Sequence, residues 1–206
     1  MQVQLDLYNS GKHPGNDADT IQTIKMVTEQ NERLSKMVKT LLDMSELQTV
    51  GRDEKIIVNA LVDEVLADLE PLAQEKNIKL IGKCKDVNMV GSDILIYRLV
   101  YNLVENAIKY NHSGGQVSVE AYQREKQVYL SVKDTGNGIP EELKERVFEP
   151  FFRVDKSRSR ELGGVGLGLA LVNEIVRVHD GSIAIRPNPS GGTIIEVEFA
   201  VNRTTA

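Results

Sequence analysis

The sequence changes its periodicity at Gly51, and this change constrains the fold more than any other feature. Residues 20–47 contain no proline or glycine, and apolar residues recur there at helical spacing: Ile24, Val27, Leu34, Met37, Val38, Leu41 and Met44. After Gly51, shorter helical and alternating patterns follow one another. The sequence therefore predicts a helical region over residues 1–50, a hinge at residues 51–54 and an α+β domain over residues 55–206.

The helical region has the pattern of a hairpin. Residues 1–8 read as the end of one helix, and residues 9–19 contain Gly11, Pro14 and Gly15, which predict a turn. Asn16 or Asp17 can cap a second helix that runs to about Leu47. Two such hairpins could pair into a four-helix bundle, and a stalk without catalytic purpose is the alternative.

The second region alternates strands and helices. Strands are expected over residues 55–59, 78–83, 116–122, 127–133, 182–186 and 193–201. Helices are expected over residues 60–75 and 92–111, and from the glycine-rich segment to about residue 179. We expect an α/β sandwich, in which a mixed, largely antiparallel sheet of about five strands carries helices on one face.

Composition limits the partners. The 25 basic and 30 acidic residues give a net charge of −5, which disfavours nucleic acid or anionic membrane as a general partner. The single cysteine, Cys84, excludes an internal disulfide and fits a reducing compartment. No apolar run reaches the ~18 residues that span a bilayer, so we expect no membrane segment in this stretch.

The predicted helix over residues 92–111 carries an unusual polar face. Within Asn102-Leu-Val-Glu-Asn106-Ala-Ile-Lys109-Tyr110, the two asparagines and Lys109 lie on one side, and most other positions are apolar. Asparagine is a poor helix former, but its side-chain oxygen suits Mg²⁺, an ion usually shared with phosphates. Lys109 can reach a phosphate as a point charge. A solvated polar stripe is the alternative for this helix taken alone.

Asp134-Thr-Gly136-Asn-Gly138 follows directly on a predicted strand. The glycines let the main chain approach a ligand closely, and a carboxylate there can accept the amino hydrogens of adenine while repelling the carbonyl oxygen of guanine. A tight turn that begins with aspartate is the alternative.

A third signal is glycine-rich. Gly163-Gly164-Val165-Gly166-Leu167-Gly168 leads into a helix, where free N–H groups and the helix dipole favour phosphate. Neither Lys-Ser nor Lys-Thr follows, so the segment is not a Walker A loop. Residues 148–161 before it contain Arg153, Lys156, Arg158 and Arg160, which predict a mobile lid over the phosphates. Phe148, Phe151 and Phe152 would anchor its base by core packing or dock on a partner helix.

These motifs, in this order, resemble the catalytic domain of bacterial sensor histidine kinases. That domain belongs to the GHKL superfamily, which it shares with DNA gyrase B, the mismatch-repair protein MutL and the ninety-kilodalton heat-shock chaperones. The resemblance covers essentially the whole chain. It implies a Bergerat-type ATP-binding fold over the α+β domain, preceded by part of a dimerization and phosphotransfer hairpin.

The resemblance also implies roles for individual residues. Asn106 would coordinate Mg²⁺ with Asn102 beside it, Lys109 would contact phosphate, and Tyr110 would lie along the adenine or ribose. Asp134 would bind the adenine amino group. The other implied contacts with ATP come from Gly136 and Gly138 in the adenine wall, Thr193 behind it, Arg153 at the γ-phosphate, and Gly164, Val165, Gly166, Leu167 and Gly168 around the phosphate chain.

One position favours a kinase over a hydrolase. Hydrolysing relatives keep a glutamate one helical turn before the metal-binding asparagine, whereas this chain has Asn102, and an amide cannot act as a general base. None of His13, His112 and His179 matches the acceptor motif of the family. We therefore expect the chain to begin downstream of the phosphorylated histidine of a longer, homodimeric sensor.

The resemblance further implies a response regulator as the phosphate acceptor and a cytoplasmic location for this part of a membrane-anchored bacterial sensor. Two alternatives remain at this stage. One is a related ATP hydrolase, and the other is a nucleotide-gated docking module without catalysis.

Overall fold

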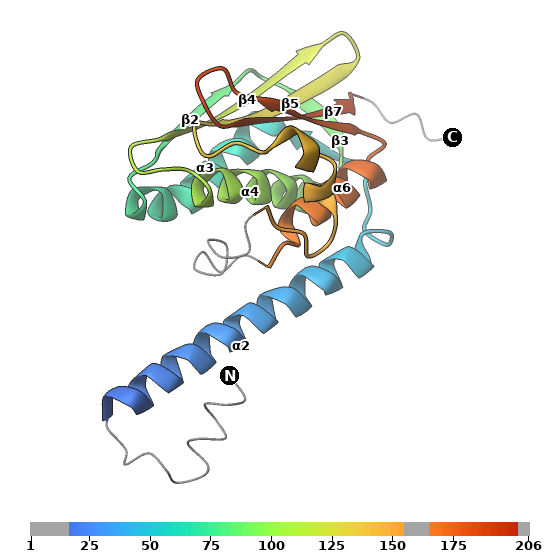
Figure 1. The fold of residues 1–206 in the computed structure, drawn as a ribbon. Helices are drawn as coiled ribbons and strands as arrows, with labels where there is room; N and C mark the ends of the chain where they lie inside the picture. The colour runs from blue at the N-terminus through green and yellow to red at the C-terminus, as the bar shows by residue number, and fades with distance from the viewer. Residues whose placement is uncertain (1–16, 155–164, 202–206) are drawn as a thin grey trace. The chain divides into compact units, whose positions relative to one another are not determined.

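The structure is a computed structural model that describes residues 17–154 and 165–201 (Figure 1). By its internal contacts the chain divides into two compact units, Met1–Lys39 and Thr40–Ala206. The last turns of helix α2 (Asp17–Glu46) therefore belong to the same unit as the α+β domain. The boundaries expected from the sequence, with a hinge at residues 51–54, stay a prediction.

Helix α2 extends over Asp17–Glu46, within one residue of the expected end. Several of its apolar side chains are exposed, including Ile21 (65%) and, from the predicted stripe, Ile24 (60%) and Val38 (56%). The first helix of the predicted hairpin and most of the turn after it lie outside the described residues.

The α+β unit contains a five-stranded sheet, in the order β2-β4-β5-β7-β6. Strand β2 pairs in parallel with β4, and the other neighbours are antiparallel. The strands are β2 (Lys79–Cys84), β4 (Gln116–Arg124), β5 (Gln127–Asp134), β6 (Ser182–Pro187) and β7 (Thr193–Ala200). Helices α3 (Val58–Glu75), α4 (Asp93–Lys109) and α6 (Gly168–Val178) cover one face (Figure 1). The predicted fold class is thus confirmed.

One predicted strand lies elsewhere. Strand β1 (Glu54–Ile57) does not join the main sheet but pairs with β3 (Asn88–Gly91) in a separate two-stranded sheet. Helix α3 begins at Val58, so β1 is shorter than expected. Strand β3 was not predicted, because a segment of four residues is too short for its alternating burial to show as a pattern in the sequence.

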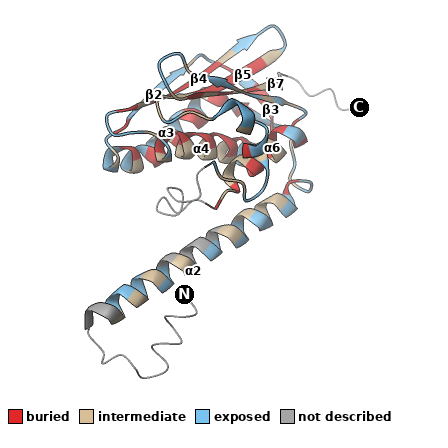
Figure 2. Cartoon of the chain, viewed as in Figure 1, coloured by how far each residue is buried: buried red, intermediate tan, exposed pale blue. Residues whose placement is uncertain are grey.

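Burial follows the predicted patterns. Buried residues line the sides of α3, α4 and α6 that face the sheet (Figure 2), and eight residues of α4 are buried. Leu47, directly after α2, is buried in this core, and Asp43 of α2 forms an ion pair with Arg98 of α4, with 2.9 Å between Oδ1 and Nη1. The apolar face of α4 packs against the sheet, which leaves its polar face for other contacts.

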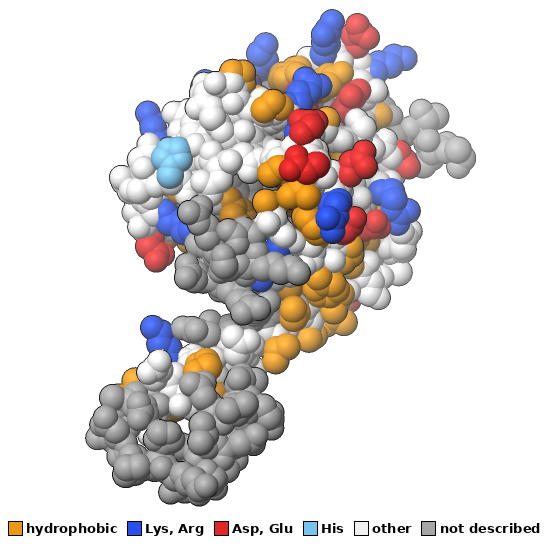
Figure 3. All heavy atoms as spheres, viewed as in Figure 1, with side chains coloured by type: hydrophobic (Ala, Val, Ile, Leu, Met, Phe, Trp, Pro, Cys, Tyr) orange, Lys and Arg blue, Asp and Glu red, His pale blue; other side chains and the backbone are white. Residues whose placement is uncertain are grey.

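Two surface properties bear on partners. Acidic and basic side chains are interspersed over the face seen in Figure 3, so charge does not separate into large regions of one sign on it. Among the described helices, none combines the length and apolar character required to cross a membrane.

Two short 3-10 helices, η1 (Glu141–Leu143) and η2 (Arg146–Phe148), follow the Asp134 motif.

Candidate nucleotide site

The polar face of α4 meets the first residue of α6. The side-chain amide of Asn102 donates to the carbonyl oxygen of Arg98 at 2.7 Å, which turns its Oδ1 toward Gly168. A Cβ placed on Gly168 would lie 3.0 Å from that oxygen and 3.5 Å from Nδ2 of Asn106. Glycine therefore permits a close approach of the two helices. The predicted metal motif and the glycine-rich segment, far apart in sequence, meet here.

The glycine-rich segment is held by contacts with the main chain of Phe151 and Phe152. Phe151 donates its N–H to the carbonyl oxygen of Gly166 at 2.8 Å. Gly166 has φ +79°, and a Cβ on it would lie 2.7 Å from the oxygen of Phe152. The side chains of Val165 and Leu167 are buried, at 8% and 2% exposure, so only their main chain can face a ligand. Gly163 and Gly164 lie outside the described residues.

Lys109 is held beside a carboxylate. Its Nζ lies 2.7 Å from Oε1 of Glu105, and the two side chains are only 15% and 12% exposed. The carbonyl oxygen of Lys109 accepts a hydrogen bond from Nζ of Lys76 at 3.3 Å, at the C-terminal end of α4. Tyr110 follows as the C-terminal cap and is 40% exposed. Sequence reasoning did not identify Glu105 as the partner of Lys109, although its i,i+4 spacing is the signal for such a pair.

Asp134 is a partly buried carboxylate with one oxygen engaged. Its Oδ1 accepts the N–H of Gly136 at 2.7 Å and the N–H of Thr193 at 3.2 Å. Burial raises the pKa of this carboxyl group above the ordinary aspartate value, and these two N–H groups partly oppose the rise. Thr193, which sequence reasoning placed behind the adenine wall, is 5% exposed and lies directly against Asp134.

The adenine wall predicted from sequence adjoins the end of α4. A Cβ on Gly136 would lie 2.5 Å from the carbonyl oxygen of Tyr110, and that oxygen accepts the N–H of Asn137 at 3.3 Å. Gly138 has φ +74°, a left-handed value that favours glycine. Helix α4 therefore contacts the Asp134 motif at its C-terminal end and the glycine-rich segment along its polar face.

Asn188, in the turn between β6 and β7, was missed by the sequence analysis. Its side-chain amide donates to the main-chain oxygen of Asp134 at 2.7 Å. Gly192 in the same turn has φ +88°, and a Cβ on it would lie 2.5 Å from Oδ1 of Asp134. The only available signal was an asparagine between two prolines, a pattern that predicts a turn but not its contact.

Arg153 has two buried hydrogen-bond donors in its guanidinium group. Within the described part of the chain, its Nε and Nη2 are buried and have no hydrogen-bond partner. Before it, Phe152 lies under the guanidinium of Arg146, 4.4 Å from ring centroid to Cζ, while Phe151 is 53% exposed with φ +66°. The phenylalanines thus do not all pack in the core. Lys156, Arg158 and Arg160 of the predicted lid lie outside the described residues.

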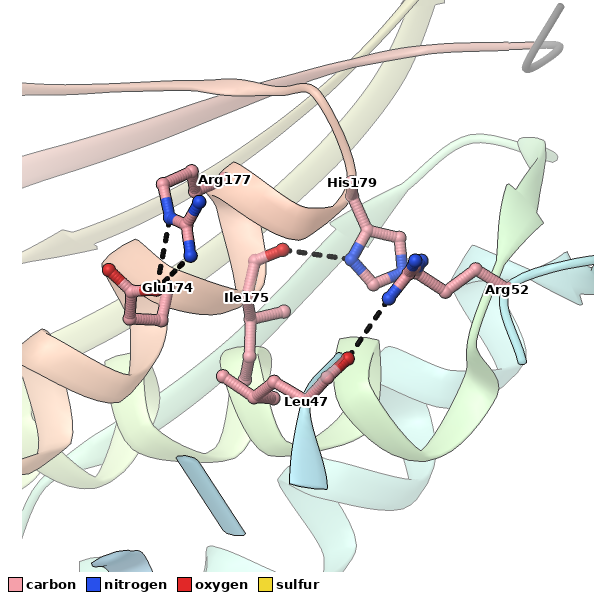
Figure 4. A network of polar contacts seen from close by, with 6 residues as sticks. All are labelled: Leu47, Arg52, Glu174, Ile175, Arg177 and His179. Atoms are coloured by element: carbon pink, nitrogen blue, oxygen red, sulfur yellow. Dashed lines mark hydrogen bonds and ion pairs between the residues drawn. The ribbon is translucent and has the colours of Figure 1, made fainter. Parts of the chain in front are cut away.

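The histidines have separate surroundings. His112 is exposed and His13 lies outside the described residues. His179 is buried: its Nε2 accepts the N–H of Ser92 at 3.1 Å, and its Nδ1 lies 2.8 Å from the carbonyl oxygen of Ile175 (Figure 4). His179 therefore ties the end of α6 to the start of α4. Nearby in the same view, Glu174 pairs with Arg177, and Arg52 donates to the oxygen of Leu47 at 2.9 Å.

Comparison with known proteins identifies the family. Residues 91–203 match the family described as histidine kinase-, DNA gyrase B-, and HSP90-like ATPase. The sensor-like histidine kinase SenX3 of Mycolicibacterium smegmatis is 36% identical over 183 residues, which cover 86% of this chain and 47% of SenX3. The chain thus spans about half the length of this curated relative.

Solved structures agree. The nucleotide-free catalytic domain of histidine kinase ThkA superposes with a TM-score of 0.66 at 27% identity, over 74% of this chain and 97% of that domain. ThkA in complex with the response regulator protein TrrA gives a TM-score of 0.77 at 25% identity, over 97% of this chain and 57% of ThkA. The chain belongs to the histidine kinase-, gyrase B- and HSP90-like ATPase family. Within it, the relatives place the chain with the ATP-binding domains of bacterial sensor histidine kinases.

Proposed function

We propose that the chain binds Mg-ATP at the junction of α4, the Asp134 motif and the start of α6, and that it supplies the kinase activity of a two-component sensor. In the intact protein the γ-phosphate would pass to a histidine upstream of this chain and then to an aspartate of a response regulator. One observation carries the proposal: α4 contacts both the Asp134 motif, through Tyr110, and the glycine-rich segment, through Asn102 and Asn106.

Adenine recognition would depend on Asp134. With Oδ1 held by Gly136 and Thr193, the carboxylate is oriented, and an ionised carboxylate accepts hydrogen bonds only. The amino group of adenine supplies the matching donor, whereas the carbonyl oxygen of guanine would be repelled. Gly136, Gly138 and Gly192 keep this wall free of side chains, and Tyr110 would line the adenine or ribose.

Phosphate would be bound on the other side of α4. The N-terminus of α6 at Gly168 offers main-chain N–H groups and the positive end of the helix dipole. The main chain at residues 164–168, Lys109 and Arg153 would complete the phosphate site. Among the described residues, Nε and Nη2 of Arg153 are buried without a hydrogen-bond partner, which supports this role because burial removes water from a charged group and a phosphate would compensate the loss.

Mg²⁺ fits these residues. Among the described residues no group of three or more histidine, cysteine, aspartate or glutamate side chains could hold a metal. The available protein ligand is an amide oxygen, which suits an ion bound mainly through substrate phosphates. Asn106 would hold it with Asn102 beside it, and the ion would neutralise charge that develops during phosphoryl transfer.

The surroundings of Asn102 and Glu105 favour a kinase over a hydrolase. Asn102 cannot remove a proton from water, and its amide is engaged with the oxygen of Arg98. The nearest carboxylate along α4, Glu105, is paired with Lys109. Phosphate bound here would therefore await an acceptor on another segment or chain.

The partners follow from this proposal. The intact protein would form a homodimer through its helical hairpins, and the exposed apolar side chains of α2 provide a surface for helix packing. A response regulator would be the next phosphate acceptor, as the structure of ThkA with TrrA suggests by analogy. This part of the protein would lie in the cytoplasm, attached to a membrane-anchored sensor.

The proposal is tested by incubating the chain with γ-labelled ATP and Mg²⁺ while free phosphate, protein-bound label and nucleotide affinity are followed together. We expect ATP to bind and to remain intact, with no label on the protein, because the acceptor histidine is proposed to lie upstream. Sustained phosphate release would show a hydrolase instead. Acid-labile label on the protein would contradict the proposed position of the acceptor.

A further inference from the structure

The contacts of Asp134 depart from regular strand pairing. Strands β5 and β7 pair up to Lys133 and Ile194, so the next pair in register is Asp134 with Thr193. Thr135 donates its N–H toward β4, to the oxygen of Gln116 at 3.2 Å. Because main-chain polar groups alternate sides along a strand, those of Asp134 face β7. In a regular ladder, Thr193 would donate its N–H to the main-chain oxygen of Asp134.

The observed bonds are different. The N–H of Thr193 donates to Oδ1 of the Asp134 side chain at 3.2 Å, and the main-chain oxygen of Asp134 accepts the side-chain amide of Asn188 at 2.7 Å. The amide thus takes the place of the ladder donor. Without it, the oxygen would either lose a partner or compete with the carboxylate for the N–H of Thr193.

Asn188 is held in the orientation that this contact needs. Its neighbours Pro187, Pro189 and Ser190 are exposed, whereas Asn188 is half-buried. Its N–H donates to the oxygen of Gly192 at 3.1 Å, its own main-chain oxygen accepts the N–H of Gly191 at 2.9 Å, and its Oδ1 accepts the N–H of Ser190 at 3.1 Å. With these groups engaged, Nδ2 is the remaining donor, and it points to Asp134.

We infer that Asn188 is a positioning residue for adenine recognition, because its amide occupies the main-chain oxygen of Asp134 and leaves the Thr193 N–H to orient the Asp134 carboxylate. The N–H groups of Gly136 and Thr193 then both donate to Oδ1 of the carboxylate. Within the described residues Oδ2 has no hydrogen-bond donor, so it is left to accept a hydrogen bond from the base. The inference rests on the proposed function, since Asn188 acts only through the adenine contact of Asp134.

The test measures dissociation constants for Mg-ATP and for Mg-ITP, whose base carries a carbonyl oxygen in place of the amino group. The proteins are the parent chain, Asn188→Ala, Asn188→Asp and, as a matched control, Ser190→Ala in the same turn. Asn188→Asp keeps the acceptor for Ser190 but removes the donor. We expect both Asn188 variants to lose about tenfold in ATP affinity with little change for ITP, because one oriented hydrogen bond is lost. Ser190→Ala keeps the ATP preference.

A purely structural role would weaken ATP and ITP equally, and that result, or an unchanged preference for ATP, would overturn the inference. A parent chain that does not distinguish ATP from ITP would refute the proposed adenine site itself, so the two failures are separable. A second readout needs no nucleotide: the amide resonance of Thr193 should move in both Asn188 variants and stay in place in Ser190→Ala. An unmoved resonance in Asn188→Ala would also overturn the inference.

Discussion

Replacing Asp134 by asparagine should separate nucleotide recognition from folding stability. Asparagine has the same shape, and its oxygen can still accept the N–H groups of Gly136 and Thr193 at Oδ1. Its amide nitrogen, however, presents donors where adenine also presents donors. A hydrogen bond to a charged group contributes about 1.5–3 kcal/mol, so ATP affinity should fall roughly 10- to 150-fold.

Asp134→Asn should leave the folding stability of the nucleotide-free chain unchanged or raise it. Burial raises the pKa of Asp134, so the folded chain holds this proton more tightly than the unfolded chain does. The stability linked to this group is therefore fully present below the unfolded pKa, near the ordinary value of 3.8, and is lost as the pH rises through the higher folded pKa. At neutral pH the ionised carboxylate opposes folding, and its neutral replacement should be as stable as the parent or more so.

Calorimetric titration with Mg-ATP and urea unfolding without nucleotide measure the two effects on the same sample. Asp63→Asn, at an exposed position of α3, is the matched control and should change neither quantity. The reasoning would be refuted if Asp134→Asn bound Mg-ATP like the parent, or if it destabilised the nucleotide-free chain by more than about 1 kcal/mol, the size of one lost hydrogen bond. The raised pKa also predicts that the preference for ATP over ITP weakens as acidification protonates Asp134.

Three further substitutions test the phosphate side of the site. Asn106→Ala should remove the part of ATP affinity that depends on Mg²⁺, so that titrations with Mg²⁺ and with a chelator give the same value; a persisting difference would exclude Asn106 as the ligand. Arg153→Ala should weaken ATP binding while leaving ADP binding within about twofold, because its guanidinium, of which two buried nitrogens have no partner among the described residues, is proposed to meet the γ-phosphate; equal losses for both nucleotides would contradict that. Gly166→Ala should lower the free energy of unfolding by more than the ~1–2 kcal/mol of left-handed strain, because its Cβ would lie 2.7 Å from the oxygen of Phe152. The control Gly191→Ala, at φ +93° in open space, measures the strain alone. Equal unfolding free energies of the two variants in urea would refute the packing argument.

Long, strongly patterned elements were predictable from the sequence. The apolar positions of α4 are buried as expected, and the strands from β4 onward match the alternating segments, because burial of one face is encoded in the periodicity. Strand β3 was not predictable: it exists through its pairing with β1, and its own four residues carry too little pattern. The same pairing kept β1 out of the main sheet.

The site was predicted by residue type, and the structure adds the contacts. Asn102 and Asn106 meet Gly168, and Asp134 meets Gly136 and Thr193, which no local pattern specifies. Asn188 was missed because its role depends on the register of β5 with β7, a long-range property. Val165 and Leu167 were expected to contact the phosphates, but their side chains pack inward, so their main chain is the part that can do so.

The most direct test of the account is a nuclear magnetic resonance titration of the isotopically labelled chain with Mg-ATP. The account predicts that the main-chain amides of Gly136, Thr193 and Gly168 shift together with one dissociation constant, because the three lie around a single nucleotide. Shifts confined to one of these positions, or to residues far from all three, would contradict a single ATP site at the junction of α4, the Asp134 motif and α6.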